Sequence, residues 1–433
     1  MNKMNKTICS LMLALVLCVS GVAAAFGAGP GLDDNGALLG TPSDPARAAI
    51  SKIMLTPMGT ALPAAEYEFA VSLVEVDGVK ATASNTPQID NVIVKLSDAK
   101  LQTTEDGIVT YVVESNDIFA GVDFPYAGVY EYQITEVANT YPHDPAHETV
   151  TYSDAIYTLT VYVKDNEAPA TGTYIYAIGS RIDRADNAGQ TGGGKVDPTP
   201  GGNGEDYTYS QMIFTNTYVK TNGSDPENPD PLNGSTLSIS KKVSGTYASS
   251  QVYFDFTLDL SVPALIAPDT AYRAYVIENG QIVTSAANGA IAGNDDQGQP
   301  YLSVTAGSSL SFSLKDGQKL AFINTPVGTR YAVNEAGTAA YIPSFIIVTN
   351  GVAQPAVSGS MGASLATGDQ YVGEAANSAD YTNERDTVTP TGLNIDDLPF
   401  IGMIAIALVA ATIGLVYKAR RNSECDAAQV LYE

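Results

Sequence analysis

Six polar side chains are predicted to point inward from strands that are otherwise apolar on that side. Successive side chains of a β-strand point to opposite faces, so residues two apart share a face. Glu136 thereby shares its face with Tyr130, Tyr132 and Ile134. The same parity predicts five further inward-facing residues: Lys52, Asn216, Lys241, Glu335 and Asn383.

The order of these residues repeats along the chain. Each half supplies an inward lysine, then a glutamate, then an asparagine. A single inward lysine or glutamate near a strand end often reaches solvent through its flexible stem. The recurrence of the same three types in the same order indicates instead that each set acts together.

This combination predicts a covalent reaction. Burial disfavours the charged form of lysine, and a neutral amine is a nucleophile. We expect a protonated glutamate to bond to the amide oxygen of the asparagine and to shuttle protons while the amine expels ammonia. The product is a neutral Lys–Asn isopeptide bond. The reaction occurs once per site, so it matures the protein and is not an enzymatic activity.

The elements that position these residues are short alternating strands in two sets. Residues 46–220 and 235–386 each contain Thr-, Val-, Tyr- and Ile-rich runs with a period of two, separated by turn dipeptides such as Asp77-Gly78 and Asn279-Gly280. Residues 221–234 read as a Pro-, Asn- and Gly-rich linker. Amphipathic helix patterns are not evident between the strands. The sequence predicts an all-β fold of two tandem antiparallel β-sandwiches.

Both ends of the chain look like targeting segments. Residues 1–25 have the basic start, apolar middle and small-residue cleavage site of a signal peptide. A flexible lead (26–45) is expected to follow. Residues 398–417 are apolar enough for a transmembrane helix, and the basic tail at 418–421 is expected to stay in the cytoplasm. The bulk of the chain should therefore lie outside the cell.

Composition excludes several functions. The chain has 433 residues with 22 Lys and Arg against 47 Asp and Glu, a net charge of −25, which argues against binding nucleic acid. Its cysteines, Cys9, Cys18 and Cys425, all lie in segments expected to be removed. We therefore expect no disulfide, no thiolate metal site and no cysteine catalysis. We also expect no cofactor.

The segment before the apolar span resembles the sorting signal of Gram-positive wall proteins. Residues 388–392 read Val-Thr-Pro-Thr-Gly and lie near the start of a signal that extends over 387–433. The resemblance implies that a sortase cuts between Thr391 and Gly392.

The two strand sets resemble the isopeptide-linkage domains of streptococcal-type major pilins. The runs FPYAGVYEYQITEV, IFTNTY and YTNER carry the resemblance, together with the opening strands of Lys52 and Lys241. It implies Ig-like pilin domains with bonds Lys52–Asn216 and Lys241–Asn383, catalysed by Glu136 and Glu335. It also implies a pilus shaft subunit at the Gram-positive cell surface, whose partners are sortase, neighbouring pilin subunits and the peptidoglycan wall.

Polymerisation of such a pilin requires an exposed lysine that accepts Thr391 of the next subunit. Lys195, in a Gly-rich loop before the last strand of the first set, is the first candidate. Lys220, at the domain edge, is the second.

Three other interpretations remain open. The chain could be a wall- or membrane-anchored adhesin stalk that binds host surface ligands without polymerising. A secreted hydrolase using paired carboxylates is less favoured, because the chain has no Trp to stack on sugars and only two His. A metal site at His143 and His147, or at Asn294-Asp295-Asp296, has weak spacing support, and we expect no metal.

Overall fold

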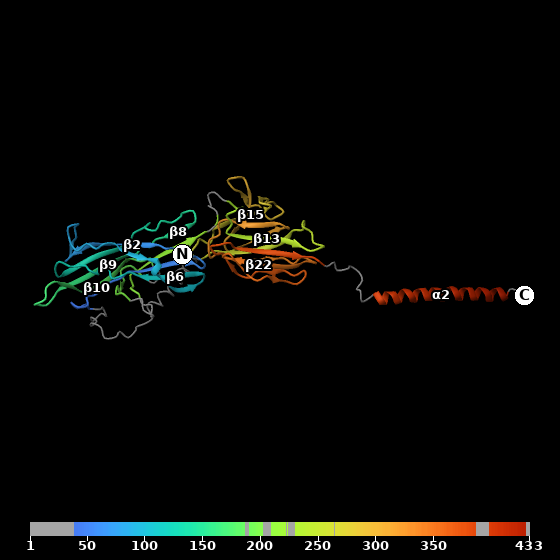
Figure 1. Ribbon diagram of the computed structural model, residues 1–433, viewed down its shortest axis with the longest axis horizontal. Helices are drawn as coiled ribbons and strands as arrows, with labels where there is room; N and C mark the ends of the chain where they lie inside the picture. Colours follow the sequence, from blue (N-terminus) through green and yellow to red (C-terminus); the bar gives the residue numbers. More distant parts are fainter. Residues whose placement is uncertain are drawn as a thin grey trace.

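The computed structural model describes residues 39–186, 190–201, 209–221, 223, 230–263, 265–386 and 398–429. They form two β domains placed end to end and a C-terminal helix (Figure 1). The all-β prediction with two sheet domains is confirmed. The predicted signal peptide (1–25), most of the lead and the sorting motif with Thr391 and Gly392 lie outside the described residues.

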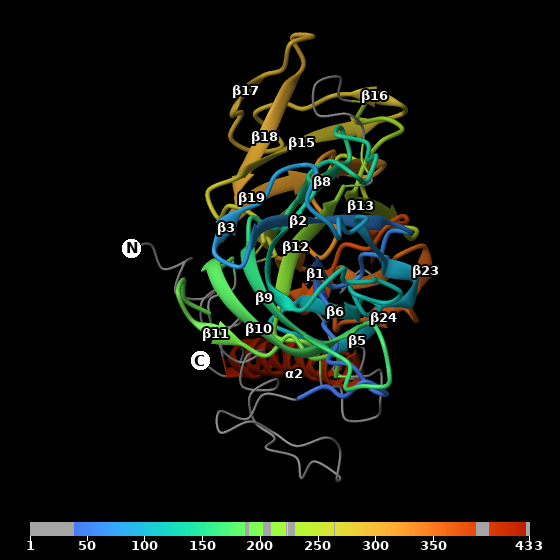
Figure 2. The same ribbon diagram turned by 90° about the vertical axis from the view of Figure 1, so that its left-hand side faces the viewer.

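The strands of the first domain are β1 (Ser51–Pro57), β2 (Glu66–Val76), β3 (Val79–Lys80), β4 (Val92–Lys95), β5 (Lys100–Glu105), β6 (Ile108–Glu114), β7 (Gly128–Glu136), β8 (Glu148–Thr151), β9 (Ile156–Asp165), β10 (Thr173–Arg184), β11 (Lys195–Val196) and β12 (Ile213–Lys220). A 3-10 turn, η1 (Leu96–Asp98), follows β4. The β1 sheet has the order β5-β6-β1-β12-β8, and the β7 sheet has the order β11-β10-β9-β7-β2-β3 with β4 beside β2. Figure 2 views this domain end-on, with β9 and β10 to the left of β1 and β6.

The strands of the second domain are β13 (Leu237–Ser244), β14 (Phe254–Ser261), β15 (Ala271–Glu278), β16 (Gln281–Ile282), β17 (Gly293–Asn294), β18 (Pro300–Thr305), β19 (Ser308–Leu314), β20 (Gln318–Phe322), β21 (Arg330–Glu335), β22 (Ile342–Thr349), β23 (Val352–Ala353), β24 (Val357–Ser358), β25 (Leu365–Ala366), β26 (Gln370–Tyr371) and β27 (Ser378–Glu384). The β13 sheet has the order β17-β18-β15-β20-β13-β27-β22-β23, and the β21 sheet has the order β19-β14-β21-β25. The shorter strands β16, β24 and β26 pair with β15, β22 and β21.

The alternating pattern produces the two cores as expected. In β14, Phe254, Phe256, Leu258 and Leu260 are buried while the residues between them face outward. The turn dipeptides also behave as predicted. The φ angles are 50° and 78° at Asp77-Gly78, and 53° and 75° at Asn279-Gly280, the left-handed values that tight hairpin turns require.

Two strand pairs depart from the antiparallel pattern, and both join the first strand of a domain to its last. β1 runs parallel to β12, and β13 runs parallel to β27. Every other pairing is antiparallel within the described residues. Each domain thus brings its two chain ends side by side in the middle of one sheet.

Helix α2 (Leu398–Gln429) contains one apolar stretch, Gly402–Ala419, with mean hydropathy 1.9 and no buried side chain. Its length and composition suffice to cross a membrane. The helix begins where the transmembrane span was predicted, but it continues through the predicted basic tail (418–421) to residue 429.

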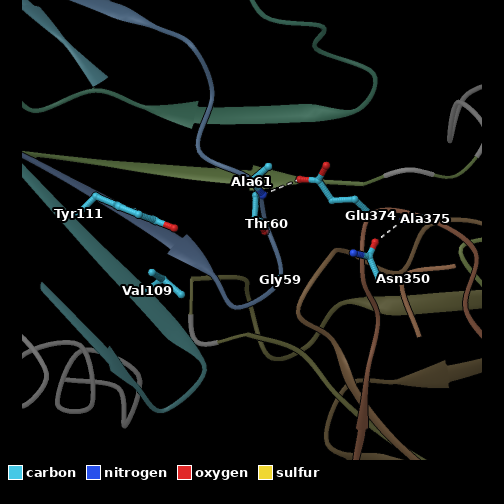
Figure 3. A pocket seen from close by; sticks show the side chains of 8 residues that line it. All are labelled: Gly59, Thr60, Ala61, Val109, Tyr111, Asn350, Glu374 and Ala375. Carbon is cyan, nitrogen blue, oxygen red and sulfur yellow. Dashed lines mark hydrogen bonds between the residues drawn. The ribbon is translucent and has the colours of Figure 1, made fainter. Parts of the chain in front are cut away.

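The two domains meet at a hollow lined by residues of both (Figure 3). The carboxylate of Glu374 extends from the second domain and accepts a hydrogen bond from the Ala61 backbone at 2.7 Å. Its other oxygen lies 3.1 Å from Lys220 Nζ. The Val327 N–H donates to the Lys220 carbonyl at 2.8 Å, so the last strand of the first domain is bonded directly to the second.

Candidate functional site

The parallel strand pairs place lysine and asparagine together in the same way in both domains. In the first, Lys52 of β1 is level with Phe214 of β12, so Asn216 is two residues further along on the same face. In the second, Lys241 of β13 is level with Tyr381, and Asn383 is again two residues further along. The matching offset follows from parallel pairing and the strand period of two.

The glutamates come from the facing sheets. Glu136 ends β7 and is level with Phe69 of β2, while Glu335 ends β21 and is level with Phe256 of β14. Each glutamate therefore reaches its lysine and asparagine across the interior of its sandwich. The structure brings together both predicted sets of three residues.

In the first domain, Glu136 links the other two side chains. Lys52 Nζ lies 2.8 Å from Oε1 and 2.9 Å from Oε2 of Glu136. Asn216 Nδ2 donates to the same Oε1 at 2.8 Å. The side chains of Lys52 and Glu136 are 0% exposed. Burial lowers the pKa of the Lys52 ammonium from 10.5 to about 8, with the Glu136 charge acting in the opposite direction.

The second domain repeats this contact. Lys241 Nζ and Asn383 Nδ2 each lie 2.7 Å from Glu335 Oε1. Burial lowers the pKa of Lys241 to about 8 and raises the pKa of the Glu335 carboxyl. Among the described residues, Glu335 Oε2 and Asn383 Oδ1 are buried without a hydrogen-bond partner.

Aromatic rings surround both amines. Lys52 Nζ lies 4.7 Å from the centre of the Tyr67 ring, and Lys241 Nζ lies 4.1 Å from that of Phe254. Phe69 and Phe256 follow at 5.8 Å and 5.7 Å. These rings exclude water from the amines, which is the physical cause of the lowered lysine pKa values.

One carboxylate oxygen in each site contacts both the attacking nitrogen of lysine and the leaving nitrogen of asparagine. It can therefore take a proton from the amine and pass it to the departing amide nitrogen. The sequence-based expectation that the glutamate bonds to the amide oxygen is not met, since Oε1 accepts from the amide nitrogen in both domains.

Two residues beside the first site were missed from sequence. The Ser153 backbone N–H donates to Asn216 Oδ1 at 2.7 Å and to Glu136 Oε2 at 3.0 Å. The Ser153 hydroxyl donates to Asp186, which also accepts from the Thr215 N–H at 3.1 Å. Both residues lie in loops, where strand periodicity gives no signal. Burial raises the pKa of the Asp186 carboxyl.

Each of the two domains matches a family model. Residues 49–219 match the Spy0128-like isopeptide containing domain, and residues 235–385 match a domain of unknown function (DUF7601). The second domain carries the same three residues in the same arrangement, although its family description names no chemistry.

Comparison with individual proteins points to pilins. The chain is 24% identical to a pilin of Streptococcus pyogenes serotype M1 over 369 residues, which is 84% of this chain and 86% of the pilin. The solved S. pyogenes major pilin is 22% identical with a TM-score of 0.31, covering 79% of this chain and 100% of that one. The S. pyogenes major pilin T3.2 is 20% identical with a TM-score of 0.29, covering 79% and 99%. The chain is therefore distantly similar to a pilin of S. pyogenes over most of its length.

The two candidate acceptor lysines differ in their surroundings. Lys195 lies in the short edge strand β11 with its side chain exposed. Lys220 is held at the domain junction by Glu374 and is 28% exposed. Lys195 is therefore the more accessible of the two.

The other residues considered from sequence lie in local turns. His147 Nδ1 contacts Asp144 at 2.8 Å, and its Nε2 lies 3.0 Å from the Gly223 carbonyl. His143 stacks on Tyr141. In the segment 294–296, Asp295 accepts hydrogen bonds from two backbone amides of its own turn.

Proposed function

We propose that this protein is a surface structural protein, a pilus shaft subunit, whose two domains are each closed by an autocatalytic isopeptide bond. The bonds join Lys52 to Asn216 and Lys241 to Asn383, with Glu136 and Glu335 as proton shuttles. The observation that carries the proposal is the recurrence of one buried Lys–Glu–Asn contact, with the same two-residue offset, on the first and last strands of both domains.

A bond at this position would make each domain resistant to pulling. Tension that enters at β1 passes through the bond to β12 and bypasses the residues between them. The loop closed in the first domain spans about 164 residues and that in the second about 142. By analogy with disulfide loops of this size, each bond contributes on the order of 5 kcal/mol by restricting the unfolded chain.

Assembly would use the two ends of the subunit. A sortase cleaves between Thr391 and Gly392 and joins Thr391 to Lys195 of a neighbouring subunit, and the last subunit is attached to the peptidoglycan wall. The apolar helix α2 holds the precursor in the membrane until that cleavage. The pilin similarity and the exposure of Lys195 support this scheme.

The intact mass of the secreted part, residues 40–391, tests the bonds. Each bond releases one ammonia, so the wild-type mass should be about 34 Da below its calculated value. The mass of Glu136→Ala or Glu335→Ala should be about 17 Da below the value calculated for that variant. The full calculated mass for a folded wild type would overturn the proposal.

A wall extract from producing cells tests polymerisation. A ladder of covalent multimers that is lost in Lys195→Arg supports the shaft role, with Lys242→Arg as an exposed-lysine control. A single band in the wild type would leave an anchored, non-polymerising adhesin or stalk built from the same domains.

A further inference from the structure

The loop between β8 and β9 places a hydrogen-bond donor on the reacting amide of the first site. The Ser153 N–H is 2.7 Å from Asn216 Oδ1, in a buried position. An N–H group can only donate, so it requires the oxygen of the Asn216 amide on its side. The amide nitrogen must then face Glu136, where it is found. Ser153 thus fixes which end of the amide meets the carboxylate.

This donor lies where negative charge develops. When Lys52 attacks Asn216 Cγ, the electron pair of the C=O bond moves to Oδ1, and a pre-aligned donor in a dry site stabilises that oxyanion. In the second domain, Asn383 Oδ1 contacts no donor among the described residues.

A second residue holds this donor in place. Asp186 accepts from the Ser153 hydroxyl and from the backbone N–H of Thr215, the neighbour of Asn216. The Ser153 hydroxyl oxygen in turn accepts from the Ala155 N–H at 3.2 Å. One carboxylate therefore ties the donor loop to the strand that carries the reacting amide.

We propose that the Ser153 backbone N–H is the oxyanion donor for isopeptide formation in the first domain, and that Asp186 is a positioning residue that aims it. The inference rests on the proposed function of the Lys52–Glu136–Asn216 site. It assigns no such device to the second domain.

The step balances as follows. Lys52 gives one proton to Glu136, and its nitrogen forms a bond to Asn216 Cγ while charge gathers on Oδ1 beside the Ser153 N–H. Glu136 passes its proton to Nδ2 and takes another from the attacking nitrogen. The Cγ–Nδ2 bond then breaks and ammonia leaves, so that the site ends with a neutral amide and a protonated Glu136.

Asp186 also has an electrostatic effect on Lys52, and this effect opposes the rate gain expected from positioning. Its negative charge favours the ammonium form of Lys52, which is not nucleophilic. If this charge were its main influence, Asp186→Asn would speed the formation of the first bond. If positioning dominates, the same variant slows it. The sign of the change separates the two roles.

The test follows both bonds in one molecule. The full chain is synthesised in a cell-free system with detergent micelles, quenched at intervals and digested, and the Lys52–Asn216 and Lys241–Asn383 cross-linked peptides are quantified. The variants are Asp186→Asn, Ser153→Ala and their combination. Ser153→Ala keeps the backbone N–H and removes only the hydroxyl that donates a hydrogen bond to Asp186. Asp183→Asn is the matched control, because Asp183 lies near the end of β10, three residues before Asp186, and accepts from the Thr158 hydroxyl instead.

We expect each single variant to slow formation of the Lys52–Asn216 bond by about tenfold or more. Removing an oxyanion donor itself costs about 10²–10³-fold in rate, which is a larger effect than misaligning one. The second bond should keep its rate. The double variant should be no slower than the slower single variant, because both changes break one contact, and Ser153→Thr should restore the rate. Unchanged or faster formation of the first bond in Asp186→Asn would overturn the inference.

Two further outcomes distinguish the proposed positioning role from a folding defect and from a failure of the proposed function. If a variant never forms the first bond, its unfolding temperature is compared with that of Asn216→Ala, which also lacks the bond but keeps the buried Lys52–Glu136 pair. Equal temperatures support positioning, whereas a lower temperature shows a structural role and overturns it. If the wild type forms neither bond, the proposed function itself fails.

Discussion

The two reactive sites share one framework and differ in what surrounds it. In both, a single glutamate oxygen touches the lysine amine and the asparagine amide nitrogen within 2.7–2.8 Å. In the first domain, Glu136 also accepts from Ser153 through Oε2, and the amide oxygen has a donor. In the second, the corresponding oxygens of Glu335 and Asn383 have no partner within the described residues.

This difference separates the essential parts of the site from its accessories. The parallel strand pair, the facing glutamate and the aromatic cover recur, so they define the reaction. Among the residues that the structure describes, the loop donor occurs beside the first site only, so it can tune the rate without being required. The second site has a carboxyl whose pKa is raised by burial. This shift favours the protonated form of Glu335.

The largest expected effect comes from removing either carboxylate. Glu136→Ala or Glu335→Ala prevents the bond and leaves a buried lysine without its partner, which costs about 3–5 kcal/mol. Loss of the cross-link adds on the order of 5 kcal/mol. We expect the altered domain to unfold at a much lower denaturant concentration than the same domain of the wild type. Chemical denaturation in which the unfolding transition of each domain is followed separately measures this difference.

The controls replace exposed residues on the same strands, with Gln133→Ala on β7 and Asn334→Ala on β21. They should leave the unfolding transitions of both domains at their wild-type denaturant concentrations. A similar loss in these controls would show that the strands, and not the carboxylates, govern stability.

The next effect is a pH dependence that appears only without the bonds. In Asn216→Ala or Asn383→Ala, the folded lysine has a pKa of about 8 and the unfolded one 10.5. Between these values the unfolded state binds more protons, so the free energy of unfolding rises with pH, by about 3 kcal/mol per lysine. Denaturant titrations from pH 7 to 11 measure it.

The bonded wild type should lack this rise, because an amide nitrogen does not titrate in that range. A rise of the same size in the wild type would mean that its lysines are still free amines.

A glutamine in place of each glutamate sharpens the comparison between the sites. Glu136 accepts four hydrogen bonds through its two oxygens, so the amide nitrogen of Glu136→Gln must face a donor. Glu335→Gln can place that nitrogen at the position of the unpartnered Oε2. We expect Glu136→Gln to be less stable than Glu335→Gln by about 1–3 kcal/mol, the cost of a buried unsatisfied group. Equal losses in chemical denaturation would show that the two surroundings are equivalent.

The smallest effect is expected when the aromatic side chains next to the two lysines are made identical. Tyr67 and Phe254 occupy corresponding positions over the two lysines. Tyr67→Phe keeps the ring, so the first bond should still form completely, and stability should change by about 1 kcal/mol or less. Peptide mapping and calorimetry check both results. An incomplete first bond would assign the Tyr67 hydroxyl a part in the reaction.

The sequence by itself determined the strands and the faces of their side chains. A period of two is a local property, so it gave the strands β2, β7 and β14 and the inward positions of all six polar residues. The turn dipeptides at 77–78 and 279–280 were equally readable, because positive φ angles select asparagine, aspartate and glycine. The start of the apolar helix at 398 followed from composition, whereas its end at 429 did not.

Only the tertiary structure decided how these residues meet. Strand periodicity carries no information on which strands pair, so the parallel contacts of β1 with β12 and β13 with β27 had to come from long-range packing. Pairing also set which carboxylate oxygen meets which amide atom, contrary to the sequence-based expectation. Ser153 and Asp186 lie in loops, where residues far apart in sequence converge without any repeating pattern. Their place beside Asn216 is fixed by the closure of the sandwich.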